Sequence, residues 1–401
     1  MKILIINSGS SSIKYKLMDM NAEISLAEGC IERIGEADGK IVHHAFPGTS
    51  RTVTKKTETA IADHAHGMEW ILALLTDSAA GVIESRSSIS AVGHRVVQGG
   101  EHFKEPTIID DEVIQSIRAN IPIAPLHNPG ALSGIATSLK MLPDARQVAV
   151  FDTAFHQTIP PKAFRYAVPS RLYDQAGIRR FGFHGTSHQY ITRMAAQGLG
   201  IPLDKINLIS LHLGNGSSIT AVSRGKSVDT SMGMTPLEGV IMGTRSGSID
   251  PAVIAYLVDN MGMTLEEVMR VLTQESGLKG LCGYNDLRDI HRAKAAGDEK
   301  AGLALDMLIY SYRKYVGAYF AVLGRVDCLV FTGGIGENDA VIREKVCHNL
   351  GHFGIELDPA LNAVLSNPVD IISVPSSRVK VMVISTNEEL EIARQTRTLV
   401  E

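Results

Sequence analysis

The sequence has little cysteine and no excess of one charge. Its 401 residues include four cysteines, none of them in a Cys-x-x-Cys pair, which argues against a zinc ribbon or a dithiol redox motif. So few thiols in a long chain do not form a disulfide scaffold, and we predict a reducing, cytoplasmic location. The formal net charge is -4, whereas nucleic-acid binders normally carry a basic excess. We therefore expect no nucleic-acid partner.

Long apolar runs are absent as well. No stretch of about 18 apolar residues occurs, so we predict neither a membrane span nor a membrane partner. The apolar run at the N-terminus is too short for a signal peptide. What is present is an ordinary globular composition, with 44% hydrophobic and 20% charged residues. Because single cores rarely grow past about 250–300 residues, this length predicts two domains.

One hairpin pattern occurs twice, about 200 residues apart. The first copy has strand-like residues on both sides of a Gly/Ser turn at 8–12, and the second surrounds a similar turn at 214–218. A repeat with so long a period favours a duplicated domain over a solenoid. Chance is the alternative interpretation, because short turns of this composition are common.

Three further apolar runs predict strands that end at polar or glycine-rich residues. The run 147–151 ends at Asp152, and the run 327–331 ends before the glycine-rich segment 332–338. The run 379–384 ends before the polar segment 385–389. In α/β sheets, ligands bind at the carboxyl ends of the strands. These ends are therefore candidate binding positions.

Helical patterns alternate with these strands and predict an α/β fold. Residues 301–323 carry apolar side chains at helical spacing, and residues 386–389 have the composition of a capping box that starts a last helix. We predict an N-terminal lobe of residues 1–150 plus a C-terminal helix at about 386–401. Residues 151–385 would form a C-terminal, nucleotide-binding lobe.

Four glycine-, serine- or threonine-rich turns lie next to predicted strand ends, at residues 8–12, 214–218, 243–247 and 333–338. Such turns expose backbone N–H groups and let an anion approach closely. No P-loop is present, because Thr220 stands where its first glycine is required. Four turns, two of them in the repeated hairpins, predict a polyphosphate held between two lobes.

Two arginines and two acids complete the pattern. Arg95 and Arg245 lie among glycine and apolar residues, where a guanidinium group can face a carboxylate or a phosphate. The alternative is an ordinary arginine in a surface loop. Asp152 follows a strand and Glu388 lies in a helix start, where a cap or a helix-dipole role is the alternative. Carboxylates beside phosphate turns suit Mg²⁺.

Long motifs recur in one order from residue 3 to about residue 395. They comprise residues 7–14, 94–97, 151–156, 180–188, 212–218, 242–247, 333–338 and 386–390. With these motifs the chain resembles the acetate kinase family, which includes propionate kinases. The resemblance implies the fold of the sugar kinase, heat-shock-70 and actin superfamily. In that fold two related lobes, each ribonuclease H-like, have a cleft between them.

The same resemblance implies reversible transfer of a phosphoryl group from ATP to acetate, giving acetyl phosphate and ADP. It implies Mg²⁺, with Mn²⁺ as an alternative metal, and a homodimer. Arg95 and Arg245 would hold the acetate carboxylate and the transferring phosphoryl group, and His184 would donate a hydrogen bond to that group. Since acetate is already ionised at pH 7, we expect Asp152 to position Arg95 or the carboxylate rather than to remove a proton.

The remaining implied roles concern binding. Asn7 and Glu388 would hold the metal through waters, and Lys14 would reach the phosphates. The small pocket for the methyl group would comprise Val97, Leu126, Phe183 and Pro236. The nucleotide would contact His212, Leu213, Gly214, Asn215, Gly216, Asp286, Leu287, Arg288, Gly334, Ile335, Gly336, Glu337 and Asn338.

Two alternatives stay open at this point. A kinase for propionate or another short acid differs little, because one methylene in an apolar pocket changes discrimination by only about 10–200-fold. A non-catalytic, ATP-dependent regulator on the same fold would be expected to carry an added partner-binding segment. The sequence departs from the family at Gln98, Met234 and Ser248, and Met234 leaves the shape of the pocket near Pro236 in question.

Overall fold

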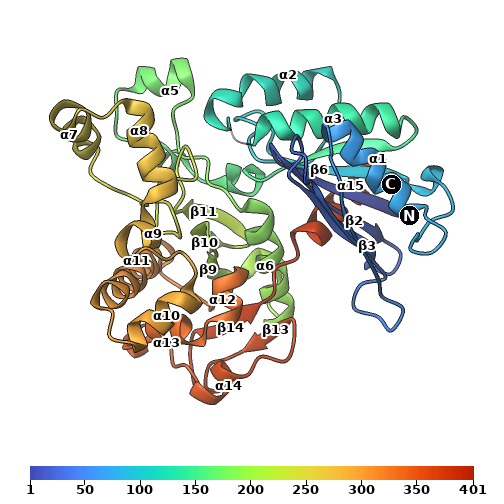
Figure 1. Ribbon diagram of the computed structural model, residues 1–401. Coiled ribbons are helices and arrows are strands. Elements are labelled where there is room, and N and C mark those ends of the chain that lie inside the picture. The colour runs from blue at the N-terminus through green and yellow to red at the C-terminus, as the bar shows by residue number, and fades with distance from the viewer. Residues whose placement is uncertain (126) are drawn as a thin grey trace. The chain divides into compact units, whose positions relative to one another are not determined.

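The computed structural model describes residues 1–125 and 127–401, so that Leu126 lies outside the described residues. Its α/β architecture divides into two compact units, coloured from blue to red along the chain in Figure 1. The first unit comprises Met1–Ala154 and Asn387–Glu401, and the second comprises Phe155–Thr386. The predicted lobe boundaries, at residues 150 and 386, concern which segments fold independently, and they stay a prediction.

Within the described residues, the first unit contains one sheet with the strand order β5-β4-β3-β2-β1-β6-β8-β7. Strands β1, β6 and β8 are parallel, and the others pair antiparallel with their neighbours. The strands are β1 (Lys2–Ser8), β2 (Ser12–Asp19), β3 (Ile24–Glu32), β4 (Lys40–Ala45), β5 (Val53–Glu58), β6 (Ala91–Val96), β7 (Thr107–Ile108) and β8 (Arg146–Phe151).

The helices of the first unit are α1 (His64–Leu75), α2 (Asp111–Ala119), α3 (Asn128–Met141) and α15 (Glu388–Val400). Helix α15 packs against β1, β6 and β8, and so both chain termini belong to this unit (Figure 1). A glycine is required where the helix meets β6, because a Cβ at Gly93 would lie 2.5 Å from Thr396 Oγ1.

The second unit contains a sheet with the order β11-β10-β9-β12-β14-β13 in the described chain. Its strands are β9 (Asn207–Leu213), β10 (Ser217–Ser223), β11 (Lys226–Thr230), β12 (Cys328–Thr332), β13 (Val369–Ile371) and β14 (Lys380–Ile384). Its helices are α4 (Pro161–Phe164), α5 (Ser170–Ala176), α6 (Gly185–Leu199), α7 (Ala252–Met261), α8 (Leu265–Arg270), α9 (Gly277–Cys282), α10 (Leu287–Ala295), α11 (Glu299–Leu323), α12 (Gly333–Asn338), α13 (Ala340–Cys347) and α14 (Pro359–Ala363).

The two sheets share one arrangement of strands. The order β3-β2-β1-β6-β8 in the first unit corresponds to β11-β10-β9-β12-β14 in the second. In each series the first three strands are antiparallel and the last three are parallel. The two repeated hairpins, β1–β2 and β9–β10, occupy equivalent positions in these series. This agreement favours a duplicated domain over a chance repeat, and the predicted α/β class is confirmed.

Two sequence expectations about local structure are wrong. The predicted turn at residues 333–338 is the short helix α12, whose first N–H, that of Gly333, is bound at 2.9 Å by the carboxylate of Glu337 from the same helix. The last helix is capped by Asn387, whose side chain accepts from Leu390 N–H at 3.1 Å, and not by Thr386. In α12 the Glu337 contact satisfies one of the first N–H groups, which have no partner within a helix.

Each unit has its own apolar core. In the first unit the core includes Leu4, Ile6 and Leu72, and in the second it includes Leu211, Leu308 and Phe331. The long helix α11 lies in the second core, as its apolar spacing predicts. Among the helices of the described residues, none is both long enough and apolar enough to cross a membrane.

Candidate active site

Polar side chains of the first unit gather at the carboxyl ends of three parallel strands. Asn7 lies at the end of β1, Arg95 near the end of β6, and Asp152 directly after β8. Lys14 on β2 pairs in register with Asn7. The structure thus brings four of the predicted residues to one edge of the sheet, the edge at which ligands bind in α/β sheets.

A partly buried ion cluster joins Arg95 to two carboxylates. Its Nη2 donates to Asp152 Oδ2 at 3.0 Å, and its Nε lies 3.7 Å from Glu388 Oε2. The Asp152 side chain is only 1% exposed, so this pairing must offset the cost of removing its charge from water. The charge of Asp152 raises the pKa of Arg95, whereas burial raises the pKa of Glu388 to about 7 against the opposing effect of Arg95.

The segment that follows β6 is held by a buried amide. Asn128 accepts from Gln98 N–H at 3.3 Å and donates to the Gln98 carbonyl oxygen at 2.9 Å. Val97, one residue earlier, is buried and directly follows β6. This fixes the position of one predicted pocket residue, whereas the second, Leu126, lies outside the described residues.

The first glycine-rich turn is closed by its own backbone. Gly9 N–H donates to the Ser12 carbonyl oxygen at 2.8 Å, and the ring of His64 lies 2.8 Å from the Gly9 carbonyl oxygen. The beginning of α3 packs so closely that a Cβ at Gly130 would lie 2.6 Å from the Gly9 carbonyl carbon. A helix N-terminus therefore lies against this turn, and its partial positive charge favours an anion there.

In the second unit, His184 precedes helix α6 with a left-handed backbone (φ +57°). Few residues other than glycine adopt this conformation, which tends to occur at functional sites. Its Nδ1 lies 2.9 Å from Ser218 Oγ on β10, and its ring stacks on that of His212 with centroids 4.2 Å apart. The hydroxyl and the second ring fix the direction in which His184 presents its other nitrogen.

A second histidine shares the same serine. His188 Nε2 lies 2.7 Å from Ser218 Oγ, and His188 Nδ1 lies 2.9 Å from Ser210 Oγ. Burial, together with the neighbouring histidines, holds the pKa of His188 well below its usual range, so this ring is neutral. Because a hydroxyl carries one hydrogen, at least one of the two rings donates to Ser218.

Arg245 lies in an irregular segment of the second unit and has a different environment from Arg95. Its Nη1 donates to the Pro236 carbonyl oxygen at 3.1 Å, and among the described residues it forms no ion pair with a carboxylate. Burial lowers the pKa of Arg245. A Cβ at Gly216 would lie 3.5 Å from Arg245 Nη1 and 3.7 Å from His184 Nε2, so both groups converge on this glycine.

Several predicted nucleotide residues line one pocket of about 530 Å³ in the second unit. Its lining comprises Gly214, Asn215, Asn285, Asp286, Leu287, Arg288, Gly334, Ile335, Asn338 and Asp339. The pocket lies next to the Arg245 segment, because Gly243 N–H donates to the Asn215 carbonyl oxygen at 3.1 Å. Residues that the sequence places far apart are thus brought to one cavity.

Other predicted nucleotide residues do not line this pocket. Leu213 is part of the apolar core, and Gly336 is buried. Glu337 binds its own backbone neighbours, accepting from Gly333 N–H at 2.9 Å and from Thr386 N–H at 3.2 Å. Glu337 therefore holds the ends of β12 and β14 together. Its position gives a structural reason for an acid in this motif.

The remaining predicted pocket residues also belong to the second unit. Phe183 is buried, and its carbonyl oxygen accepts from His156 Nε2 at 3.0 Å. Pro236 offers its carbonyl oxygen to Arg245. The structure describes Val97, Phe183 and Pro236 but not Leu126. A methyl pocket made of all four residues therefore stays a prediction.

Sequence reasoning missed several residues of this region. Asn285 and Asp339 line the nucleotide pocket, and each directly adjoins a predicted segment, so the neighbourhood of the motifs could have indicated them. Ser218 and His188 lie within or beside quoted motifs, but their contacts with His184 depend on how β10 pairs and how α6 packs. No spacing along the chain carries that information.

Comparisons with known proteins identify the family. The model of the acetokinase family matches residues 2–394. An acetate kinase of Desulfotalea psychrophila is 52% identical over 403 residues, which cover 100% of both chains. The crystal structure of Porphyromonas gingivalis acetate kinase has a TM-score of 0.95, 43% identity and full coverage of both chains. A Francisella tularensis propionate kinase has a TM-score of 0.90 with 42% identity over 99% of both chains.

The chain belongs to the acetokinase family. The predicted family, the predicted fold and the prediction of a phosphoryl-transferring kinase are thereby confirmed. The family implies ATP or ADP as a substrate and a divalent metal. The roles assigned to single residues remain to be tested.

Proposed function

We propose that the protein transfers the γ-phosphoryl group of ATP to acetate, reversibly, giving acetyl phosphate and ADP. The observation that carries this proposal is the position of Arg245. This half-buried cation has no carboxylate partner among the described residues and lies beside His184 and next to the nucleotide pocket. A guanidinium group placed in this way suits a phosphoryl group that carries negative charge during transfer.

The transfer requires little covalent chemistry from the protein. An acetate oxygen forms a bond to the γ-phosphorus while the bond from that phosphorus to the bridging oxygen breaks, and ADP leaves with the oxygen. No proton has to move, because acetate is ionised at pH 7. The protein's task is to hold the two reactants in line and to stabilise the charge.

The residues divide this task between positioning and stabilisation. We assign the carboxylate of acetate and the transferring phosphoryl group to Arg95 and Arg245, and a hydrogen bond to the phosphoryl group to His184. Asp152 holds Arg95 through the 3.0 Å bond and is itself nearly inaccessible to solvent. We therefore assign it a positioning role, in agreement with the absence of any need for a general base.

A divalent metal fits the oxygen groups at the edge of the first sheet. Glu388 is partly exposed (22%). The charge of Asp152 raises the pKa of the Glu388 carboxyl group, and the charge of Lys14 lowers it. The hydroxyl oxygens of Ser8, the last residue of β1, and Thr153, two residues after β8, are buried without a hydrogen-bond partner in the described chain. We propose Mg²⁺, with Mn²⁺ as an alternative, held by Glu388 and Asn7 through waters. When bound, it would neutralise charge on the phosphates.

We assign ATP and acetate to the residues that are predicted to bind them. We propose that ATP occupies the pocket of about 530 Å³ and that Lys14 contacts its phosphates. The methyl group of acetate would contact Val97, Phe183 and Pro236, together with Leu126. A small pocket of this kind favours acetate over longer acids, although the energetic difference per methylene is modest.

A homodimer and a cytoplasmic location complete the proposal. Large apolar side chains on three helices of the second unit are exposed, and such surfaces support contact with another subunit. They are Tyr256, Met261, Leu265, Leu303 and Tyr310. The four cysteines are free thiols, as a reducing compartment permits. Sedimentation of the purified protein measures the oligomeric state.

The test of the proposed function is acyl phosphate formation trapped with hydroxylamine. The protein is incubated with Mg-ATP and acetate, propionate or butyrate in parallel. We expect acetate to be the best acceptor. Propionate equal to or ahead of acetate would keep the chemistry but change the substrate. No product from any acid, in folded protein that binds ATP, would refute the proposal and favour the regulator.

A further inference from the structure

Residues 231–251 connect β11 to α7 without helix or strand and carry both Pro236 and Arg245. Connections of this length are uncommon in compact domains and are usually functional. Because the backbone polar groups of this segment are not paired in a sheet ladder or a helix, they are bonded to the backbone of other segments, as where Gly243 N–H donates to the Asn215 carbonyl oxygen, and to side chains. The groups that hold this segment therefore also hold the proposed catalytic arginine.

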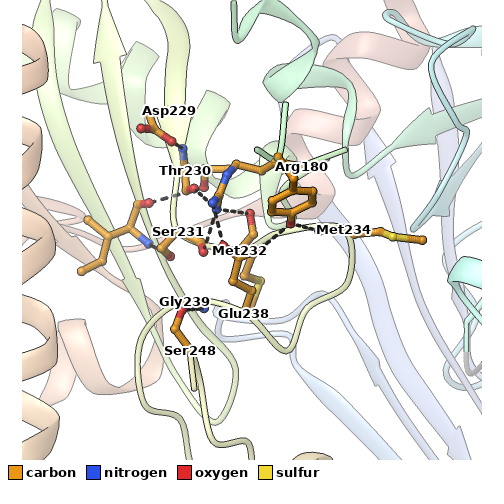
Figure 2. A network of polar contacts seen from close by, with 11 residues as sticks. Arg180, Asp229, Thr230, Ser231, Met232, Met234, Glu238, Gly239 and Ser248 are labelled. Atoms are coloured by element: carbon orange, nitrogen blue, oxygen red, sulfur yellow. Dashed lines mark hydrogen bonds and ion pairs between the residues drawn. The ribbon is translucent and has the colours of Figure 1, made fainter. Parts of the chain in front are cut away.

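Arg180 binds the first part of the segment. Its Nη1 donates to the carbonyl oxygens of Thr230, Ser231 and Met232 at 2.8, 3.1 and 3.2 Å. Its Nη2 donates to Glu238 Oε1 at 2.6 Å, as Figure 2 shows. One guanidinium group thus connects the end of β11 to a residue further along the same loop.

Tyr166 binds the other carboxylate oxygen of Glu238. Its hydroxyl donates to Glu238 Oε2 at 2.5 Å and accepts from Met234 N–H at 2.9 Å. A side chain at Gly233 would overlap both the Tyr166 hydroxyl and the Glu238 carboxylate. The cluster is therefore closely packed, and both carboxylate oxygens are used.

The anchored residues lie on both sides of Pro236. Met234 is held two residues before it and Glu238 two residues after it, so the Pro236 carbonyl has little freedom to turn. That carbonyl is the oxygen to which Arg245 Nη1 donates at 3.1 Å. The Arg180 and Glu238 side chains are only 16% and 31% exposed, so solvent competes weakly for their ion pair.

We infer that Tyr166, Arg180 and Glu238 form a positioning cluster that sets the Pro236 carbonyl and, through it, the direction of the Arg245 guanidinium group. The inference rests on the proposed function of Arg245. The three residues are positioning residues rather than catalytic ones, because they act through Pro236. Since Pro236 is also assigned to the methyl pocket, the cluster should affect the binding of acetate more than that of ATP.

Two substitutions test the cluster. Glu238→Gln keeps the size of the side chain but removes the charge that pairs with Arg180. Tyr166→Phe keeps the ring but removes the hydroxyl that holds Met234 N–H. Because small misplacements of a positioned group can cost up to about 100-fold in rate, we expect about 10-fold losses in kcat/KM for acetate. The KM for ATP should change less than about twofold, and the two losses should be less than multiplicative.

The matched control is Asp327→Asn. Asp327 also pairs with an arginine, Arg325, at 3.2 Å, but it lies just before β12, at the end of the strand away from α12. This variant loses an ion pair in the same unit without touching the loop. We expect its thermal midpoint to move while the KM for acetate stays unchanged. A purely structural role of Glu238 would give the same result as this control.

Hydrogen–deuterium exchange of the segment 231–245 gives a readout independent of activity. In the full-length protein, Glu238→Gln should increase exchange in this segment and Asp327→Asn should not. Unchanged exchange together with an unchanged KM for acetate would overturn the inference. Failure of the wild-type protein to form acyl phosphate would refute the proposed function instead, whereas the exchange result would still decide whether the cluster holds the loop.

Discussion

The two candidate arginines have opposite electrostatic surroundings. Arg95 in the first unit is bonded to Asp152 and lies near Glu388, whereas Arg245 in the second unit is bonded to a carbonyl oxygen and lacks a carboxylate partner in the described chain. The charge of Asp152 raises the pKa of Arg95, and burial lowers that of Arg245. The charge of one arginine is therefore compensated by carboxylates, whereas the described residues offer no carboxylate to the other.

The difference follows from where each arginine lies in the chain. Arg95 is on a central strand, β6, and the neighbouring parallel strand β8 delivers Asp152 beside it. Arg245 lies in a segment of glycines packed against other backbone, where a Cβ at Gly277 would lie 2.7 Å from the Arg245 carbonyl oxygen. The carboxyl ends of parallel strands gather charged side chains, whereas the irregular segment of Arg245 offers it a carbonyl oxygen and, among the described residues, no carboxylate.

The largest expected effect is on turnover. Removing one transition-state arginine from a phosphoryl-transfer enzyme costs about 10³–10⁵ in rate. We expect losses of that order for Arg95→Ala and for Arg245→Ala, measured as hydroxylamine-trapped acyl phosphate, with far-ultraviolet circular dichroism unchanged. Near-wild-type turnover in either variant would remove that arginine from the proposed mechanism.

A second prediction concerns acid stability in the first unit. His94 is fully buried beside Arg95 in β6, with its Nε2 bonded to Gln147 Oε1 at 2.8 Å, and burial lowers its pKa to about 4. Below about pH 6.5 the unfolded chain takes up a proton that the folded protein refuses, so stability falls as the pH falls toward 4. The loss approaches about 3 kcal/mol.

Urea unfolding between pH 7 and pH 4 measures this loss. His94→Gln should flatten the pH dependence, and the matched variant of an exposed histidine, His352→Gln, should not. Parallel curves for the wild type and His94→Gln would show that His94 does not carry the acid sensitivity.

A third prediction concerns the histidine network of the second unit. Ser218→Ala removes the hydroxyl shared by His184 and His188. His184 Nδ1 and His188 Nε2 then lose this hydrogen-bond partner. We expect a loss of about 1–3 kcal/mol in stability and about 10-fold in turnover. Ser223→Ala, at the other end of β10, is the control, and its turnover should equal that of the wild type. Equal turnover in both variants would exclude Ser218 from orienting His184.

The smallest expected effect comes from a single methyl group. Gly216 does not have a positive φ, and an alanine Cβ would only contact Arg245 and His184. Gly216→Ala should therefore fold normally yet slow turnover about fivefold, which corresponds to roughly 1 kcal/mol. Gly302→Ala in α11, where a Cβ meets nothing within 4 Å, provides the control. Unchanged turnover in Gly216→Ala would mean that reactants do not approach this glycine.

Much of the carboxyl-end edge of the first unit's sheet can be predicted from the sequence, because the end of a strand is a local feature. The repeated hairpins and the strand before Asp152 follow from apolar runs that stop at polar residues, and the structure gives both hairpins in register. The roles of Arg95, Asp152 and the other site residues came only with the family resemblance. They stay predictions until variants are measured.

Tertiary contacts explain what the sequence could not predict. Helix α12 forms from residues of low helix propensity, and its first N–H is bound by Glu337 of the same helix, a contact that has no signature in a Gly-Gly-Ile-Gly segment. Ser218 and Glu238 are ordinary residues in the sequence, and only folding brings them to His184 and Arg180. Such contacts join distant segments, and no periodicity records them.

The most direct test of the contrast between the two arginines is urea unfolding of Arg95→Ala and Arg245→Ala beside the wild type. Arg95→Ala leaves Asp152 buried without this pair and should lose roughly 3–5 kcal/mol. Arg245→Ala removes a partly buried charge that has no carboxylate partner among the described residues and should lose no stability. An equal loss of stability in the two variants would contradict the account.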